Sequence, residues 1–141
     1  MRYIHYLLLS FILSCNTKDS CNQLKEGTFS LYENDKLVGQ LYRKDNIQIE
    51  KYSDKEPYTI GKLKYINDCE LQMRHYYVKE SIDTITWLVS YIPLAKNTFK
   101  VNAKPAYIDT LNYSYMAKMV KTDKNLPIEL HELFKKLNQS K

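Results

Sequence analysis

Apolar and polar residues alternate through most of this sequence, and turn-forming residues interrupt the alternation at short intervals. A strand turns successive side chains to opposite faces, so this pattern is typical of strands that bury one face. The segment 69–78 illustrates it, because Leu71, Met73, His75 and Tyr77 alternate with mostly polar neighbours. The sequence therefore predicts a mainly β fold.

We expect about eight strands, at residues 28–32, 37–43, 47–52, 59–66, 69–78, 83–92, 98–101 and 110–120. The polar pairs Asn34-Asp35 and Asp45-Asn46 favour tight turns between the first three strands. Pro93 is expected to end the sixth, because proline cannot donate to a strand ladder. Short strands at this spacing predict an antiparallel meander that forms a curled sheet or a lipocalin-like barrel. Barrel closure would also remove exposed sheet edges.

Residues 124–141 follow a different pattern, which predicts a C-terminal helix at 127–138 packed on the sheet. Pro127 suits the first turn of a helix, and Asn125 is a candidate cap. Five apolar residues fall on or near one face: Ile128, Leu130, Leu133, Phe134 and Leu137. A helix that binds a partner is the alternative.

Residues 1–14 have the parts of a secretory signal peptide, namely a positive Arg2, an apolar centre and the small Ser14. The apolar centre is about half as long as the ~20 residues that a membrane-spanning helix needs. A buried first strand or helix is the alternative. We expect residues 1–14 to be removed, 15–26 to form a lipidated tether and lead-in, and 27–123 to form the β domain.

The sequence Ile12-Leu13-Ser14-Cys15 resembles the lipobox of bacterial lipoproteins, with Ile12 and Leu13 departing from the favoured residues. The resemblance implies a diacylglyceryl thioether on Cys15 and an acyl chain, such as palmitate, on its new amino terminus. Two or more such chains hold a protein firmly at a membrane. We therefore expect a lipid-anchored envelope protein of the outer membrane, on its periplasmic face or at the cell surface.

The sequence has three cysteines, and lipidation of Cys15 would leave Cys21 and Cys69 as a pair. An exported domain meets an oxidising compartment in which a disulfide persists. The chain-entropy model values a bridge over this long loop at roughly 4 kcal/mol. Two buried free thiols are the alternative. Neither cysteine has Cys-x-x-Cys spacing, so we expect no metal site.

Charge and motifs indicate neither nucleic-acid binding nor catalysis. The net charge of +5, or +4 without Arg2, is scattered rather than gathered in one basic run. Three glycines exclude a glycine-rich phosphate loop, and no Gly-x-Ser-x-Gly elbow occurs. His75 and His131 are expected to be half-exposed polar residues. We expect no enzyme and no cofactor, with an envelope hydrolase as the least favoured alternative.

Tyrosine is unusually frequent, with thirteen copies. A tyrosine offers an apolar body and a polar tip, which suits the wall of a ligand cavity. The candidates for lining such a cavity are Tyr77, Trp87, Tyr113 and Tyr115. The alternative is that these side chains fill the core and cover strand faces, since strands favour tyrosine.

Several short motifs together resemble a family of small lipoproteins from flavobacteria and their relatives. They are the lipobox, Cys21, Gly27-Thr28-Phe29, Arg43, Gln48-Ile49-Glu50 and Ile66-Asn67-Asp68-Cys69, and the match spans residue 12 to about residue 77. Members carry a tryptophan or apolar residue before Asp-Cys, where this chain has Tyr65-Ile66. Some relatives carry a topoisomerase label, which no residue here supports.

Asp83-Thr84-Ile85 and Asp109-Thr110-Leu111 are similar to the sites that such bacteria O-glycosylate, which implies modification of Thr84 and Thr110. We expect a non-enzymatic, lipid-anchored envelope lipoprotein whose domain binds a small apolar molecule, a lipid or an envelope partner. A solid barrel interior would count against a ligand. The alternative is a structural or protein-interaction lipoprotein that acts through its C-terminal helix or a sheet edge.

Overall fold

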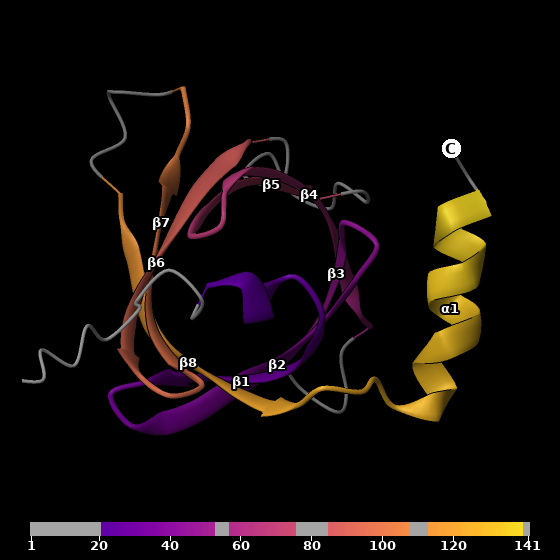
Figure 1. The fold of residues 1–141 in the computed structure, drawn as a ribbon. Coiled ribbons are helices and arrows are strands. Elements are labelled where there is room, and N and C mark those ends of the chain that lie inside the picture. The colour runs from indigo at the N-terminus through magenta and orange to yellow at the C-terminus, as the bar shows by residue number, and fades with distance from the viewer. Residues whose placement is uncertain (1–20, 53–56, 76–84, 108–112, 140–141) are drawn as a thin grey trace, which may run out of the picture.

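The structure is a computed structural model, and it describes residues 21–52, 57–75, 85–107 and 113–139. Its strands are β1 (Gly27–Glu33), β2 (Lys36–Lys44), β3 (Ile47–Lys51), β4 (Thr59–Asn67), β5 (Glu70–His75), β6 (Trp87–Ala95), β7 (Thr98–Pro105) and β8 (Tyr115–Asp123). Each strand pairs antiparallel with the next, and β1 also pairs with β8 (Figure 1). The predicted β fold is confirmed, and its sheet is closed into a lipocalin-like barrel.

Several predicted strand boundaries are wrong; for example, β7 continues to Pro105 rather than ending at residue 101. β6 does not end at Pro93 but continues to Ala95, with a register shift between these two residues. A proline is tolerated there because the ladder is already irregular at a bulge. The last strand begins at Tyr115 rather than at residue 110. Tyr113 and Ser114 precede it outside any strand, and residues 108–112 lie outside the described residues.

Two hairpin turns match the sequence prediction. Asn34 and Asp35 have φ values of 48° and 61°, and Asp45 and Asn46 have values of 52° and 64°. Positive φ at both central residues is the conformation of a type I′ turn, which matches the twist of antiparallel strands. Asn and Asp tolerate it better than most residues because their short side chains bond locally. These pairs fix the β1–β2 and β2–β3 connections.

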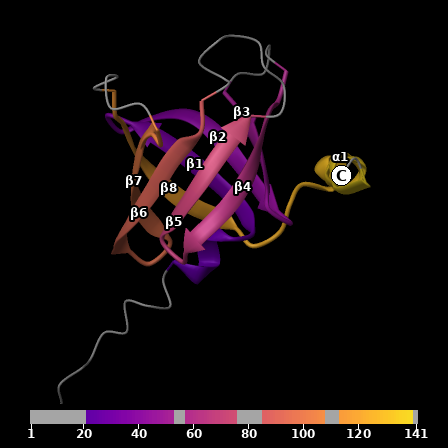
Figure 2. The same cartoon turned by 90° about the horizontal axis from the view of Figure 1, so that it is seen from above.

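The helix α1 (Ile128–Gln139) packs outside the barrel, beside β3 (Figures 1 and 2). Its buried residues Leu130, Phe134 and Leu137 form an apolar cluster with outward-facing residues of β2, β3 and β4, which are Tyr42, Ile47, Ile49 and Ile60. The predicted helix is confirmed. One assignment to its apolar face is wrong, because Ile128 is 84% exposed. Two residues of α-helix turn the chain through about 200°, so Ile128 faces away from Leu130.

The residues just before β1 cover one end of the barrel. This segment, residues 21–24, contains a short 3₁₀ helix at Asn22–Leu24, and we call it the N-terminal plug (Figure 2). Cys21 and Leu24 are fully buried, and the predicted disulfide joins Cys21 to Cys69 with a Cα–Cα distance of 5.2 Å. Lys121 of β8 adds hydrogen bonds of 2.6 Å to the carbonyls of Gln23 and Glu26. The plug is therefore held both covalently and by hydrogen bonds.

Among the described residues, no helix has the length and apolar character that crossing a membrane requires.

Candidate functional site

A cavity of about 320 Å³ lies inside the barrel, toward the end where β1, β3 and β5 finish. Its volume falls at the lower end of the ~300–1,000 Å³ range of ligand pockets and would hold roughly ten waters. Its apolar walls include Leu31, Leu41, Met73, Val89, Val101, Ala103 and Met119. Its polar lining includes Glu33, Arg43, Gln48, Glu50, Tyr52 and His75. The interior is therefore neither solid nor uniformly apolar.

Both faces of β3 are buried, and Gln48 and Glu50 lie on the face that points into the barrel. A strand with one buried face would turn Ile47 and Ile49 inward and leave the polar residues in water. Here the two isoleucines pack against α1 on the outside, so Gln48 and Glu50 face the interior, each 3% exposed. Local alternation carries no sign of this reversal. The inward orientation of Gln48 and Glu50 follows from the docking of α1 on the opposite face of β3.

Arg43 lies at the end of the polar cluster that is nearest to the N-terminal plug. It is 2% exposed, and its Nε donates to Gln48 Oε1 at 2.6 Å. Its Nη1 donates to the carbonyl of Leu24 at 3.1 Å, and its Nη2 donates to the hydroxyl of Tyr91 at 2.5 Å. The guanidinium carbon also lies 5.4 Å from the ring centre of Phe29 and 5.2 Å from that of Tyr91. The guanidinium thus links the N-terminal plug to the barrel wall.

The surroundings of Arg43 keep it charged. Burial acts to lower the pKa of Arg43, but the neighbouring Tyr91, Tyr65 and Glu50 act in the other direction, and the pKa is raised overall. A buried cation is stable only when it is hydrogen-bonded and faces compensating charge. Glu50 supplies that charge.

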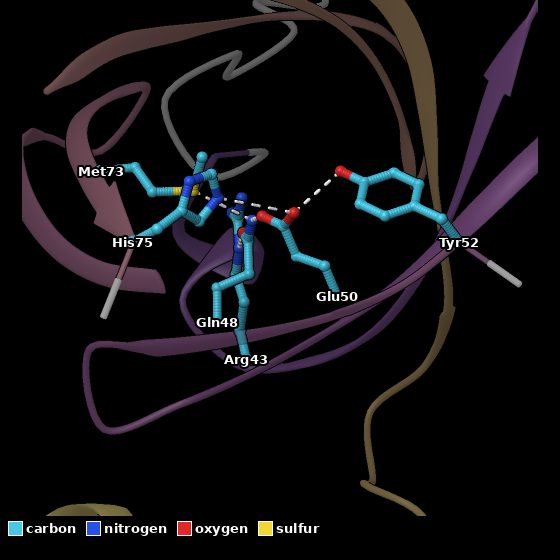
Figure 3. Close-up of polar contacts among 6 residues, drawn as sticks. All are labelled: Arg43, Gln48, Glu50, Tyr52, Met73 and His75. Atoms are coloured by element: carbon cyan, nitrogen blue, oxygen red, sulfur yellow. Dashed lines mark hydrogen bonds and ion pairs between the residues drawn. The ribbon is translucent and has the colours of Figure 1, made fainter. Parts of the chain in front are cut away.

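Glu50 stands at the centre of the cluster shown in Figure 3. Its Oε1 accepts a hydrogen bond of 2.5 Å from Gln48 Nε2, and its Oε2 accepts one of 2.8 Å from the Tyr52 hydroxyl. His75 Nε2 lies 3.8 Å from Oε2. Burial, followed by the negative charge of Glu50, raises the pKa of Tyr52, so this phenol stays a proton donor. A Cβ on Gly39 would lie 2.8 Å from the Tyr52 ring, so the glycine gives that ring its space.

Aromatic side chains and a second carboxylate line the cavity at β1, β6 and β8. The Tyr115 hydroxyl donates to Glu33 Oε1 at 2.5 Å, and burial, then this bond, raises the pKa of Tyr115. The rings of Trp87 and Tyr113 meet edge to face, with centroids 5.8 Å apart. The cavity lining thus includes three of the predicted lining residues, Trp87, Tyr113 and Tyr115. The fourth, Tyr77, lies outside the described residues.

The two histidines differ in burial: His75 lies inside the barrel and His131 lies on the surface of α1. His75 lies in the barrel with 13% of its side chain exposed, deeper than the half-exposed position expected for it. Closure of the barrel turns its strand face inward. His131 is exposed on α1, as expected. Lipidation of Cys15 and glycosylation of Thr84 and Thr110 stay predictions, because these residues lie outside the described part of the chain.

Among the residues that the structure describes, no three histidine, cysteine, aspartate or glutamate side chains are grouped as metal ligands would be. Comparisons with models of protein families, with curated proteins and with solved structures found no match to this chain. The resemblance to flavobacterial lipoproteins therefore stays a prediction.

Several of the short motifs that carry this resemblance, all within the described residues, converge in space. Arg43, Gln48 and Glu50 form one hydrogen-bonded group, and Cys21 and Cys69 form the disulfide that holds the plug next to Arg43. The sequence predicted the disulfide but did not assign Arg43, Gln48 or Glu50 to a site. Two signals could have pointed to the interior, namely the recurrence of these polar residues in the motifs and the apolar strand face that an amphipathic helix needs to cover.

Proposed function

We propose that this protein is a lipid-anchored lipoprotein of the cell envelope that binds a small molecule inside its barrel without chemically changing it. The cavity of about 320 Å³ is the observation that carries the binding proposal. A closed barrel with a packed interior would have no room for a ligand. Here apolar walls surround a few fixed polar groups, which is the usual composition of a small-molecule site.

The polar groups are held in place before any ligand arrives. Gln48 bridges Arg43 and Glu50, and Tyr52 bonds the other oxygen of Glu50. A preorganised site loses less entropy on binding than one that must first be ordered. These fixed contacts suit recognition of one polar head group by a rigid wall.

The alternative, an interaction lipoprotein acting through a sheet edge or the helix, has less support. β1 pairs with β8, so the eight described strands form a ring without a free edge. The apolar face of α1 already packs on the barrel through Leu130, Phe134 and Leu137. In the described part of the chain, the strands have no free edge and the residues on the apolar face of α1 are already buried, so neither is available to a partner.

The anchoring proposal rests on the signal-like residues 1–14 and the lipobox-like segment that ends at Cys15. Cys15→Ser tests it through membrane fractionation and intact mass. We expect the wild-type chain to be cleaved before Cys15, to gain the mass of its acyl groups and to sediment with membranes. We expect the serine variant to do none of these. Unchanged processing and membrane association of Cys15→Ser would refute the anchor.

Native mass spectrometry of the protein purified from its own host tests the binding proposal. We expect a co-purified small molecule in the wild-type protein and its loss in Ala103→Phe, because Ala103 lines the cavity and is 9% exposed. Lys104→Phe is the matched control, since it adds the same ring at the adjacent, exposed position. A bound molecule that survives Ala103→Phe, or that is lost equally from Lys104→Phe, would contradict the cavity as the binding site.

A further inference from the structure

The charged side chains that line the cavity are not balanced. Two carboxylates, those of Glu33 and Glu50, face one guanidinium, that of Arg43. Buried charges are costly unless they are paired, so a lining with surplus carboxylate favours a cationic occupant. The surplus is one negative charge whenever His75 is neutral.

The one guanidinium is poorly placed to receive an anion. Each of the three nitrogens of Arg43 donates to a protein acceptor, which are Gln48, the Leu24 carbonyl and Tyr91. The rings of Phe29 and Tyr91 also lie close to the guanidinium and restrict the approach of a ligand. The hydrogen bonds use three of the five N–H groups, so an anionic ligand would have only the two remaining N–H groups of Arg43 to bond and would also meet the negative charge of Glu50. The surroundings of the Arg43 guanidinium therefore disfavour a carboxylate ligand.

The carboxylates are surrounded by aromatic rings. Tyr52 bonds Glu50, and Tyr115 bonds Glu33, so each ring is held beside an anionic oxygen. Trp87 and Tyr113 add two more rings to the lining. Aromatic faces attract cations, most strongly where water is excluded. Carboxylate oxygens and ring faces in one cavity are together suited to an ammonium group.

We propose that the cavity binds an organic cation, namely a primary ammonium carried on an apolar body, with the ammonium directed toward Glu33 and Glu50. This inference rests on the proposed binding function. An ammonium has three N–H donors and no acceptor, which matches a lining rich in carboxylate and phenol oxygens. The apolar body would lie against Leu31, Val89 and Met119.

Trp87 provides the readout, because it is the only tryptophan in the sequence and it lines the cavity. The full-length protein, reconstituted in phosphatidylcholine vesicles, is titrated at pH 8 with hexylamine, hexanol and hexanoate, with protein-free vesicles as the blank. At pH 8 hexylamine carries its ammonium charge and hexanoate its carboxylate charge, so the three probes differ in the charge of one end. We expect hexylamine to change the tryptophan emission at concentrations at least tenfold lower than hexanol, and hexanoate to bind weakest.

Glu33→Gln is the decisive variant, because Glu50 compensates the buried Arg43 and its replacement would also destabilise the barrel. We expect Glu33→Gln to weaken hexylamine binding at least tenfold and to leave hexanol binding unchanged. Asp35→Asn is the matched control, since Asp35 is an exposed carboxylate, 88% accessible, that pairs with Lys118 outside the cavity. It should bind hexylamine as the wild type does.

The outcomes separate the two proposals. If hexanol or hexanoate binds better than hexylamine, or if Glu33→Gln has no effect, the cationic ligand is wrong while the binding function stands. If none of the three probes binds and no molecule co-purifies with the protein, the binding function itself is wrong.

Discussion

Replacing Arg43 tests whether the polar interior stabilises the barrel. The side chain is 2% exposed and joins the N-terminal plug, β3 and β6 through Leu24, Gln48 and Tyr91. Arg43→Met keeps an apolar stem over the neighbouring rings but removes the charge and every donor. Glu50 would then be a buried carboxylate without its cation, a defect that costs about 3–5 kcal/mol. We expect the free energy of unfolding to fall by that amount.

Urea denaturation of four proteins measures this effect: the wild type, Arg43→Met, Glu50→Gln and the double variant. We expect the double variant to lose less than the sum of the single losses, because two neutral side chains leave no unpaired charge. Arg74→Met is the control, since Arg74 is exposed on β5 and its loss should cost no more than about 0.5 kcal/mol. A loss below about 1 kcal/mol for Arg43→Met, or additive losses in the cycle, would refute the reasoning.

Three further predictions concern the disulfide, the helix and the tyrosines. Replacing Cys21 and Cys69 by serine should lower the free energy of unfolding by roughly 4 kcal/mol, because the bridge closes a loop with a sequence separation of 48 residues. Urea denaturation measures this loss, and a value under about 1 kcal/mol would contradict the prediction. Phe134→Ala should lower the free energy of unfolding by about 3–5 kcal/mol, because Phe134 is buried between α1 and the barrel, whereas Ile128→Ala, at an exposed position, should lower it much less. Thermal melts that show equal losses of stability for the two variants would argue against the docked helix. Burial and Glu50 raise the pKa of Tyr52 above its ordinary value of 10.0, so the stability this phenol contributes is fully present below pH 10 and is lost as the pH rises beyond it. Absorbance at 295 nm should show phenols that ionise well above pH 10, and titration of every tyrosine near pH 10 would contradict this.

The strands could be predicted from the sequence because side chains along a strand alternate between the two faces of the barrel wall, and this pattern is visible in a few consecutive residues. Leu71 and Met73 alternate with polar neighbours, and Asn34-Asp35 supplies the two positive φ values that a tight turn needs. The helix was also predictable, since Leu130, Phe134 and Leu137 recur with helical spacing. Each of these signals lies within a few residues of the element that it specifies.

The polar interior could not be predicted in the same way. Gln48 and Glu50 have the alternation of solvent-facing residues, and only the docking of α1 on Ile47 and Ile49 turns them inward. That contact joins segments far apart in the sequence. An amphipathic helix needs an apolar surface to cover, and the outward Tyr42, Ile47 and Ile49 provide it. Asking which strand face the helix covers would therefore have indicated the polar interior.

The most direct test of a ligand-binding barrel is a crystal structure of the protein isolated from its own host. We predict electron density for a small molecule between Trp87 and Tyr115, with its polar end toward Glu50. A barrel in which side chains have collapsed into the cavity, leaving no space for a molecule beside Ala103, would contradict the account.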